Sequence, residues 1–582
     1  MSSELATELS RQTLGLVARF EQRADSFKGR TDLAGLLVPV DVGAAESAAR
    51  ELLGEGEHSA TGIDGSMDFD ERLQMILFYA NATAYSCPFT VGEHVRFDLD
   101  SAHHETKLEA SAAVPLWAED LNSVFSKEPE LDIELEHSID RIPNSFMTLG
   151  ELFLAWQAAS RSRIVFLDRP LSGTYSTLSR DARNLFKRGE TRLTGWVDGR
   201  GASMLDLELA VSLGPPSMAV PLRGRFLPLA AVRALQGGPK SIGELAESLR
   251  VDEQGARQAV KGVRRLDKKY GNRLLRDPDS AVLELSKEAS GFWERVTGLA
   301  EAYTTDVFSD RRHPLAVGQD QYLNILDVNT VALVMLLMLC ERAAQTGALV
   351  VGIAKDTTAT DITRAVLPFA SSTGYLRLSS SPPRLKNDRA FLSILSSENP
   401  EIRTPWRTVG YDSSFSTMVE VEGGLASARK VVSREGLFIR SFFQLRTLKS
   451  DPSVRSQVFL FDRVCGQRED STALRKFEVK ERGGPVVLNA YFEGDAKSRT
   501  SNLILHLLSL NDNPEVFEAY GHNQLLYLAD KAVKAEIRMM RSSLHGVADL
   551  RVGGVSRRRK IFGLVSPYRQ QRAEAEHRRA RQ

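Results

Sequence analysis

The chain has 582 residues, of which 42% are hydrophobic and 26% are charged. This ordinary globular composition excludes a wholly disordered, collagen-like or fibrous protein, and the length is that of several domains or of one core with large insertions. The 75 basic and 75 acidic residues cancel, so no global attraction to nucleic acid or membrane is expected, and a polyanion must meet a local patch.

Cysteine content and hydropathy point to a reducing interior. Cys87, Cys340 and Cys465 are widely spaced and match neither a disulfide framework nor a zinc motif, which favours a cytoplasmic location. Residues 1–30 lack the apolar stretch of a signal peptide. The longest apolar run, Val331 to Cys340, is shorter than the ~20 residues of a membrane helix. We expect a buried core helix there and no membrane association.

The sequence pattern indicates one α/β core that is interrupted by a helical block. Residues 1–55 have helical periodicity and are expected to form helices that flank the first strand. The first core part, 56–215, is predicted to hold strands at 61–66, 73–80 and 95–99, a helix over 148–161 and a buried strand over 163–168. Strands followed by a helix and another buried strand indicate an α/β arrangement.

Residues 216–303 have a mostly helical sequence pattern. Three short helices, over 227–235, from 241 and from 252, followed by a hairpin near 268–275, resemble a winged helix-turn-helix inserted into the core. The second core part, 304–540, is predicted to contain a helix around 331, strands at 348–354, 436–445, 458–461 and 485–492, and helices at 499–510 and 524–539. The last segment, 541–582, is a basic tail, partly helical or disordered.

Three acidic residues suggest metal chemistry. Asp64, in an Asp-Gly-Ser turn, and Asp168 are each predicted to end a buried strand, and Glu151 lies on the helix before the second strand. If the strands are neighbours, these carboxylates repel one another unless a cation intervenes. Oxygen ligands without thiols or paired histidines select Mg²⁺ or Mn²⁺, which activate water in phosphodiester cleavage.

Each residue also has a structural explanation. Asp-Gly-Ser is a common turn, Thr148 and Glu151 have capping-box spacing, and Asp168 can simply pair with a neighbour or cap a loop. The polar cluster 103–105, His-His-Glu, lacks helical ligand spacing and is expected to be a loop. The order of strand-end Asp, helix Glu and strand-end Asp is more informative, because it repeats the layout of ribonuclease H-like nucleases.

Four segments together resemble the NurA family of DNA end-processing nucleases, which work with the HerA ATPase. They are GIDGS (62–66), ELFLAWQAASRSRIVFLDRPLSGTYS (151–176), LVVGIAKDT (349–357) and YGHNQLLYLADKAVK (520–534). The resemblance implies a ribonuclease H-like mixed sheet flanked by helices, two Mn²⁺ or Mg²⁺ ions, nuclease activity on single- and double-stranded DNA, a homodimer, and docking on a hexameric HerA-type translocase. It makes Asp64, Glu151 and Asp168 metal ligands.

The last motif departs from the family pattern. NurA proteins usually show Tyr-Pro and then Ala-His on the last core helix, with the His at the metal site, whereas here Tyr520 precedes Gly521 and Ala529 precedes Asp530. Asp530 would complete the metal site as a fourth carboxylate, or it simply pairs with Lys534 along the helix. Lys355 is expected to neutralise charge near the scissile phosphate or merely to end a strand.

Two basic surfaces are candidates for DNA contact. Arg257, Lys261 and Arg265 follow one face of the third inserted helix, where winged helices meet phosphates, although such helices also contact proteins or only solvent. Arg557, Arg558 and Arg559 lie in the tail. Residues 551–582 hold ten basic and two acidic residues, so the tail carries +8 and the rest −8.

The sequence therefore predicts a metal-dependent DNA nuclease fed by a HerA-type translocase, in bacterial anti-phage defence or DNA end resection and repair. One alternative is a catalytically silent NurA-like clamp that binds DNA and regulates the motor. Another is a transcriptional regulator led by the winged helix, which leaves the spaced carboxylates unexplained.

Overall fold

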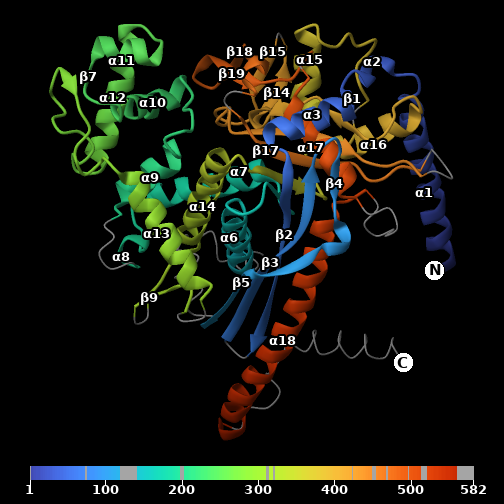
Figure 1. Ribbon diagram of the computed structural model, residues 1–582, viewed down its shortest axis with the longest axis horizontal. Coiled ribbons are helices and arrows are strands. Elements are labelled where there is room, and N and C mark those ends of the chain that lie inside the picture. Colours follow the sequence, from blue (N-terminus) through green and yellow to red (C-terminus); the bar gives the residue numbers. More distant parts are fainter. Residues whose placement is uncertain are drawn as a thin grey trace.

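The computed structural model describes residues 2–72, 75–117, 141–196, 202–309, 313–318, 321–383, 385–422, 424–448, 454–466, 469–495, 497–512 and 521–559. Within these ranges, eleven strands join one large mixed sheet that has helices packed on it (Figure 1). The expected α/β class is confirmed as a mixed sheet flanked by helices. The ribonuclease H-like detail and the domain boundaries stay predictions.

Three parallel strands form the centre of this sheet, in the order β11 (Leu349–Ala354), β6 (Ile164–Leu167) and β2 (Gly56–Arg72). Beyond β11 the antiparallel neighbours are β17 (Phe459–Val464), β16 (Phe438–Gln444), β12 (Trp406–Thr408) and β1 (Leu37–Pro39), with β13 (Tyr411–Asp412) also paired to β16. Beyond β2 lies β3 (Met75–Val91), which pairs with β4 (Val95–Phe97) and β5 (His103–Trp117). The end of β6 therefore lies beside the middle of β2, and β11 lies on the other side of β6.

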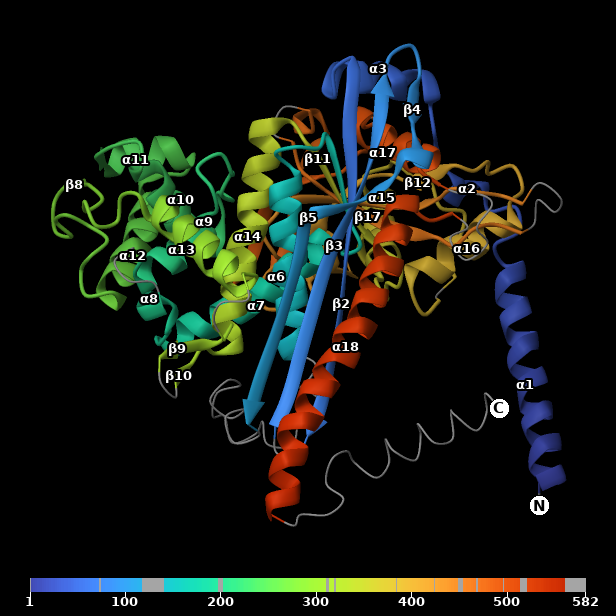
Figure 2. The same cartoon turned by 60° about the horizontal axis from the view of Figure 1, so that its bottom comes forward.

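Strands β2, β3 and β5 extend as a long arm with a helix on each face (Figure 2). Helix α6 (Arg141–Ala158) packs on one face and the long helix α18 (Gln524–Arg559) on the other. A Cβ atom on Gly62 would lie 2.7 Å from the Leu525 Cβ, so glycine lets the first turn of α18 rest directly on β2. Since side chains alternate along a strand, Asp64 faces α18 as Gly62 does.

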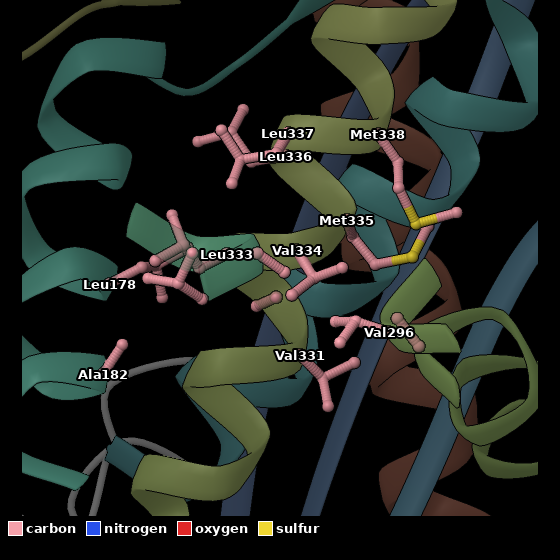
Figure 3. Packing of buried hydrophobic residues seen from close by; sticks show 14 of the residues in the cluster. Leu178, Ala182, Val296, Val331, Leu333, Val334, Met335, Leu336, Leu337 and Met338 are labelled. Carbon is pink, nitrogen blue, oxygen red and sulfur yellow. The ribbon is translucent and has the colours of Figure 1, made fainter. Parts of the chain in front are cut away.

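The apolar run forms the middle of helix α14 (Ile325–Thr346), which is buried as expected. Its side chains pack between α7 (Leu171–Arg188), through Leu178 and Ala182, and α13 (Phe292–Val307), through Val296 (Figure 3). In the described part of the chain, no helix has the length and hydropathy needed to cross a membrane.

The remaining elements surround this core. The N-terminal segment holds α1 (Ser2–Asp25), α2 (Thr31–Ala34) and α3 (Val42–Leu52) besides β1. Between α7 and α14 lie α8 (Leu193–Trp196), α9 (Met204–Leu213), α10 (Leu227–Leu235), α11 (Ile242–Leu249), α12 (Glu253–Lys269) and α13, with the small pairs β7 (Lys240–Ser241) and β8 (Val282–Leu283), β9 (Ala316–Gly318) and β10 (Gln321–Tyr322). Helices α10 to α12 stand apart from the sheet (Figure 1).

A second, four-stranded sheet follows β13. Its order is β14 (Met418–Val421), β15 (Gly424–Ser427), β18 (Leu474–Glu481) and β19 (Gly484–Tyr491). Helices α15 (Leu367–Ser372) and α16 (Asp388–Glu398) precede it, and α17 (Arg499–Leu510) follows it. The expected strands and helices of the second core part are confirmed in type, with shifted bounds.

Four local predictions are wrong. The Asp-Gly-Ser segment is not a turn, because β2 continues through it and is paired with β3 along its length. Residues 103–105 begin β5 and are not a loop. Lys268 and Lys269 end α12 and are not in a hairpin. Helix α6 begins seven residues before Thr148. The predicted tail boundary at 541 lies within the span of α18, which ends at Arg559, and it stays a prediction like the other domain boundaries.

Candidate metal centre beside the end of strand β6

Asp64 and Asp168 lie side by side where β6 ends. The last hydrogen bond between the strands runs from the Asp168 backbone N–H to the Ile63 carbonyl, at 3.0 Å. Beyond it β2 loses its parallel neighbour, and Asp64 is the first residue past that point. Its carboxylate is buried and accepts a hydrogen bond from the Gly65 N–H at 2.8 Å. The two strands are neighbours in the sheet, which is the condition for a shared cation, although β2 itself does not end there.

Glu151 reaches the same place from the opposite face of the sheet. A Cβ atom on Gly65 would lie 2.4 Å from Glu151 Oε1, so the missing side chain makes the room that the carboxylate fills. Thr148 lies in the middle of α6 and donates its hydroxyl to the Asn144 carbonyl at 2.7 Å. Capping therefore does not explain Glu151, and its 2% exposure makes it a buried acid beside Asp64 and Asp168.

Two side-chain cations pair with these acids. Lys355, just after β11, forms an ion pair with Asp168, and Arg169 forms one with Glu151. Burial alone would lower the pKa of the Lys355 ammonium, but the charge and hydrogen bond of Asp168, with the charges of Asp64 and Asp530, together outweigh burial and the pKa is raised. Lys355 is therefore a fixed positive charge. Sequence reasoning missed Arg169, although its position directly after Asp168 was the available signal.

Asp530 lies on α18, one turn before Lys534. The two side chains form an ion pair at 2.7 Å, so the helical pairing expected for Asp530 is present. Its charge also acts on both Asp64 and Lys355. Asp530 thus belongs to the same electrostatic cluster, at its more exposed side.

His522, just before α18, is a further residue at this site that sequence reasoning missed. Its ring is buried, stacks on Phe459 at 5.5 Å, and has an Nε2 atom with no hydrogen-bond partner among the described residues. Burial, reinforced by Lys355, lowers its pKa to about 3, while Asp530 acts in the opposite direction. A neutral imidazole with an open nitrogen therefore stands next to the cluster.

The crowded acids make this site favourable for binding a positive charge. Burial comes first and the charges of Asp168 and Glu151 follow, and together they raise the pKa of Asp64 to about 9. Burial also raises the pKa of Glu151, against the opposing effect of Arg169. Carboxylate oxygens crowded in this way, with an open buried nitrogen nearby, fit a divalent cation.

The proposed DNA-binding residues are only partly described. Arg257, Lys261 and Arg265 are exposed on α12, and Arg257 pairs with Glu253 at 3.3 Å. That helix belongs to the block that stands apart from the sheet (Figure 1). Residues 557–559 fall within α18, without a described side-chain position, and Tyr520 lies outside the described residues. DNA contact by these residues stays a prediction.

No protein-family model matches the chain, and no curated protein sequence matches it. Solved structures of similar shape include the NurA nuclease from Sulfolobus solfataricus, at 10% identity and a TM-score of 0.37, covering 93% of this chain and 96% of that one. NurA bound to dAMP and manganese has 12% identity, a TM-score of 0.35 and the same coverages. Identity and TM-score are both low, so the roles of Asp64 and its neighbours are inferred from their own geometry.

Proposed function

We propose that this chain is a divalent-metal-dependent nuclease that hydrolyses phosphodiester bonds of DNA. One observation carries the proposal: Asp64 and Asp168 lie together where β6 ends, and Gly65 admits the buried Glu151 carboxylate to the same point. Three acids from separate elements cost folding energy at such a place unless a cation offsets their charge. The choice of DNA follows the sequence resemblance to NurA.

The ion is Mn²⁺ or Mg²⁺, and two ions are proposed. Asp64, Glu151 and Asp168, with Asp530 at the exposed side, would hold them, because hard oxygen donors select these ions. When bound, such ions supply an activated water and stabilise the leaving oxygen in phosphodiester hydrolysis.

The remaining residues have separate tasks. Lys355 keeps its proton and places a fixed positive charge where the phosphate gains negative charge in the transition state. Arg169 holds the Glu151 carboxylate and limits its repulsion with Asp168. The neutral His522 ring offers its open nitrogen to the site and cannot act as a cation near neutral pH.

The proposal extends to partners. A HerA-type hexameric ATPase would feed DNA to a homodimer of this chain, in anti-phage defence or in DNA end resection. The exposed basic face of α12, with Arg257, Lys261 and Arg265, is proposed to contact DNA or the motor. The basic C-terminal segment, including Arg557, Arg558 and Arg559, is proposed to bind phosphate.

The ion pairs at the site favour a second candidate. Lys355 and Arg169 already neutralise Asp168 and Glu151, which suits a clamp that binds DNA and a motor without cleaving either strand. The two candidates differ in whether the carboxylates bind metal and whether DNA is cut.

Degradation of linear single- and double-stranded DNA decides between them. The chain, alone and with a HerA-type ATPase, is assayed with Mn²⁺, with Mg²⁺ and with chelator. We expect metal-dependent cleavage that Asp64→Asn and Asp168→Asn each abolish. Asp68→Asn is the matched control, because Asp68 faces the same side of β2 but pairs with Arg541 at 3.1 Å. Activity that persists in both site variants contradicts the nuclease assignment, and DNA binding without cleavage in any mixture favours the clamp.

A further inference from the structure

A second group of metal-ligating side chains lies across the sheet from Asp64, on the face that α18 covers. His104 and Glu109 come from β5, and Glu536 comes from α18. They are the one group of three His, Cys, Asp or Glu residues, among those the structure describes, whose donor atoms all lie within 4.8 Å of one another. All three are partly exposed, so an ion in solution can reach them.

An irregularity in β5 brings the two strand residues together. Thr83 is paired with Glu109, and Tyr85 is paired with His104, so four residues of β5, 105–108, lie opposite the single residue Ala84. In a regular strand, residues five positions apart point to opposite faces and lie about 16 Å apart. The bulge instead brings His104 Nε2 to 3.1 Å from Glu109 Oε1. Bulges of this kind commonly re-aim a side chain near a functional site.

Three oxygens converge on that imidazole nitrogen. His104 Nε2 lies 2.6 Å from Thr83 Oγ1, 3.1 Å from Glu109 Oε1 and 3.9 Å from Glu536 Oε1. Two ligands bound to one first-row ion at about 2.1 Å lie roughly 3 Å from each other. The distances from His104 Nε2 to the Thr83 and Glu109 oxygens are close to this value. A small movement of the Glu536 side chain would bring its Oε1 atom to the same distance.

Neighbouring side chains hold these ligands in place. Asn81 donates its amide to Glu536 Oε2, which leaves Oε1 turned toward His104. Ser111 in turn donates to the Asn81 carbonyl oxygen at 3.2 Å. The His104 ring stacks on Tyr85 with centroids 5.4 Å apart. Such supporting contacts are what orients ligands at metal sites.

This group is separate from the Asp64 site. Asp64, Thr83 and Glu109 are opposite one another on β2, β3 and β5, so Asp64 and Glu109 are two strand spacings, about 10 Å, apart. On α18, Asp530 and Glu536 are six residues, about 9 Å, apart. Ions that act together in hydrolysis are about 3.5–4 Å apart. The second group therefore has its own set of ligands, and Thr83, directly opposite Asp64 on β3, lies between the two groups.

We propose that His104, Glu109 and Glu536, with the Thr83 hydroxyl, bind one divalent transition-metal ion that ties α18 to the β3–β5 arm. The mixed nitrogen and oxygen donors suit Mn²⁺ or Zn²⁺ better than Mg²⁺, which prefers oxygen alone. This site stands independently of the proposed nuclease function, because its ligands and its ion are distinct.

Ion counting tests the proposal in a protein whose first site is removed. The full chain carrying Asp64→Asn and Asp168→Asn is dialysed against Mn²⁺ or Zn²⁺, and bound metal per chain is measured. We expect one retained ion, which is lost when Glu536→Gln or His104→Gln is added. Pulsed electron paramagnetic resonance of bound Mn²⁺ should show imidazole nitrogen coupling that His104→Gln removes. Asn81→Ala should weaken binding about 10-fold or more.

The matched control is Glu105→Gln, which changes an acid in the same bulge that contacts His103 at 3.2 Å and is not among the donors. It should leave the ion count unchanged. The proposal is overturned if no ion is retained, if Glu105→Gln removes the ion equally, or if nitrogen coupling persists in His104→Gln. Glu536→Gln, at a partly exposed position of α18, keeps the test valid should the His104 variant fail to fold. Because the readout is metal binding, loss of nuclease activity does not affect it.

Discussion

Replacing Asp64 by asparagine should abolish the proposed activity and yet stabilise the metal-free protein. The pKa of Asp64 is raised from 3.8 to about 9, first by burial and then by the charges of Asp168 and Glu151. Between these two pH values the folded chain keeps a proton that the unfolded chain releases. Stability in chelator therefore falls as pH rises from about 4 to about 9, and it is fully present only below the lower value.

The magnitude at neutral pH follows from the same numbers. One pH unit corresponds to about 1.36 kcal/mol, so the unfavourable contribution of Asp64 at pH 7 is about 4 kcal/mol. This energy is the same for any pKa of Asp64 in the folded chain that lies above 7. Asparagine carries no charge at any of these pH values, so the variant should recover much of that energy and lose the corresponding pH slope.

Urea unfolding in chelator, measured at several pH values from about 5 to 8, checks this expectation. Asp32→Asn is the contrasting control, because Arg30 and the Ser379 N–H group, the latter at 2.8 Å, hold the pKa of the Asp32 carboxyl well below its usual range. That substitution should destabilise the fold. If Asp64→Asn lowers the urea midpoint, or leaves the pH slope unchanged, the inference that the buried Asp64 carboxylate lacks a compensating charge is wrong.

Three further predictions concern single residues. Gly65→Ala places a Cβ atom 2.4 Å from Glu151 Oε1 and 2.6 Å from Met147 Cγ, so it should displace the Glu151 carboxylate, lower cleavage about 100-fold and cost about 1–3 kcal/mol of stability. Gly92→Ala has open space around it and should change neither the cleavage rate nor the stability; equal cleavage rates in the two variants would refute the close fit. His522→Gln should make the fold less sensitive to acid. The pKa of His522 is lowered from 6.5 to about 3, so its contribution to stability is present above pH 6.5 and is lost as the pH falls, by about 2 kcal/mol at pH 5. Urea unfolding at pH 5 and 7 shows whether the variant loses this dependence of stability on pH. Lys355→Ala should lower the cleavage rate by about 100-fold or more at saturating substrate, and a change confined to KM would contradict a transition-state role.

The elements that place the site were largely readable from hydrophobic runs. The apolar strand before Asp168, the strand before Lys355 and the helix with Glu151 were all predicted, because burial requires such runs wherever an element lies in the core. The local sequence predicts a turn at Asp64, because Asp, Gly and Ser are all common turn residues. In the structure, the unbroken ladder with β3 overrides that local preference.

Other parts of the site had no sequence signal. His522 comes near Lys355 and Asp530 only because α18 crosses β2, and Gly62 permits that approach. His104 and Glu109 are five residues apart, a spacing that fits neither a helix face nor a strand face. A bulge joins them, and bulges depend on pairing partners that a single strand sequence does not reveal.

Helix α18 is one continuous helix that carries one acid of each candidate metal site. Asp530 belongs to the Asp64 site and Glu536 to the His104 site, and Ile537, the next residue, packs on Leu77 and Tyr79 of β3. Since both acids belong to one continuous helix, their places depend on how α18 packs against β2 and β3. A substitution that altered this packing would therefore displace Asp530 and Glu536 together.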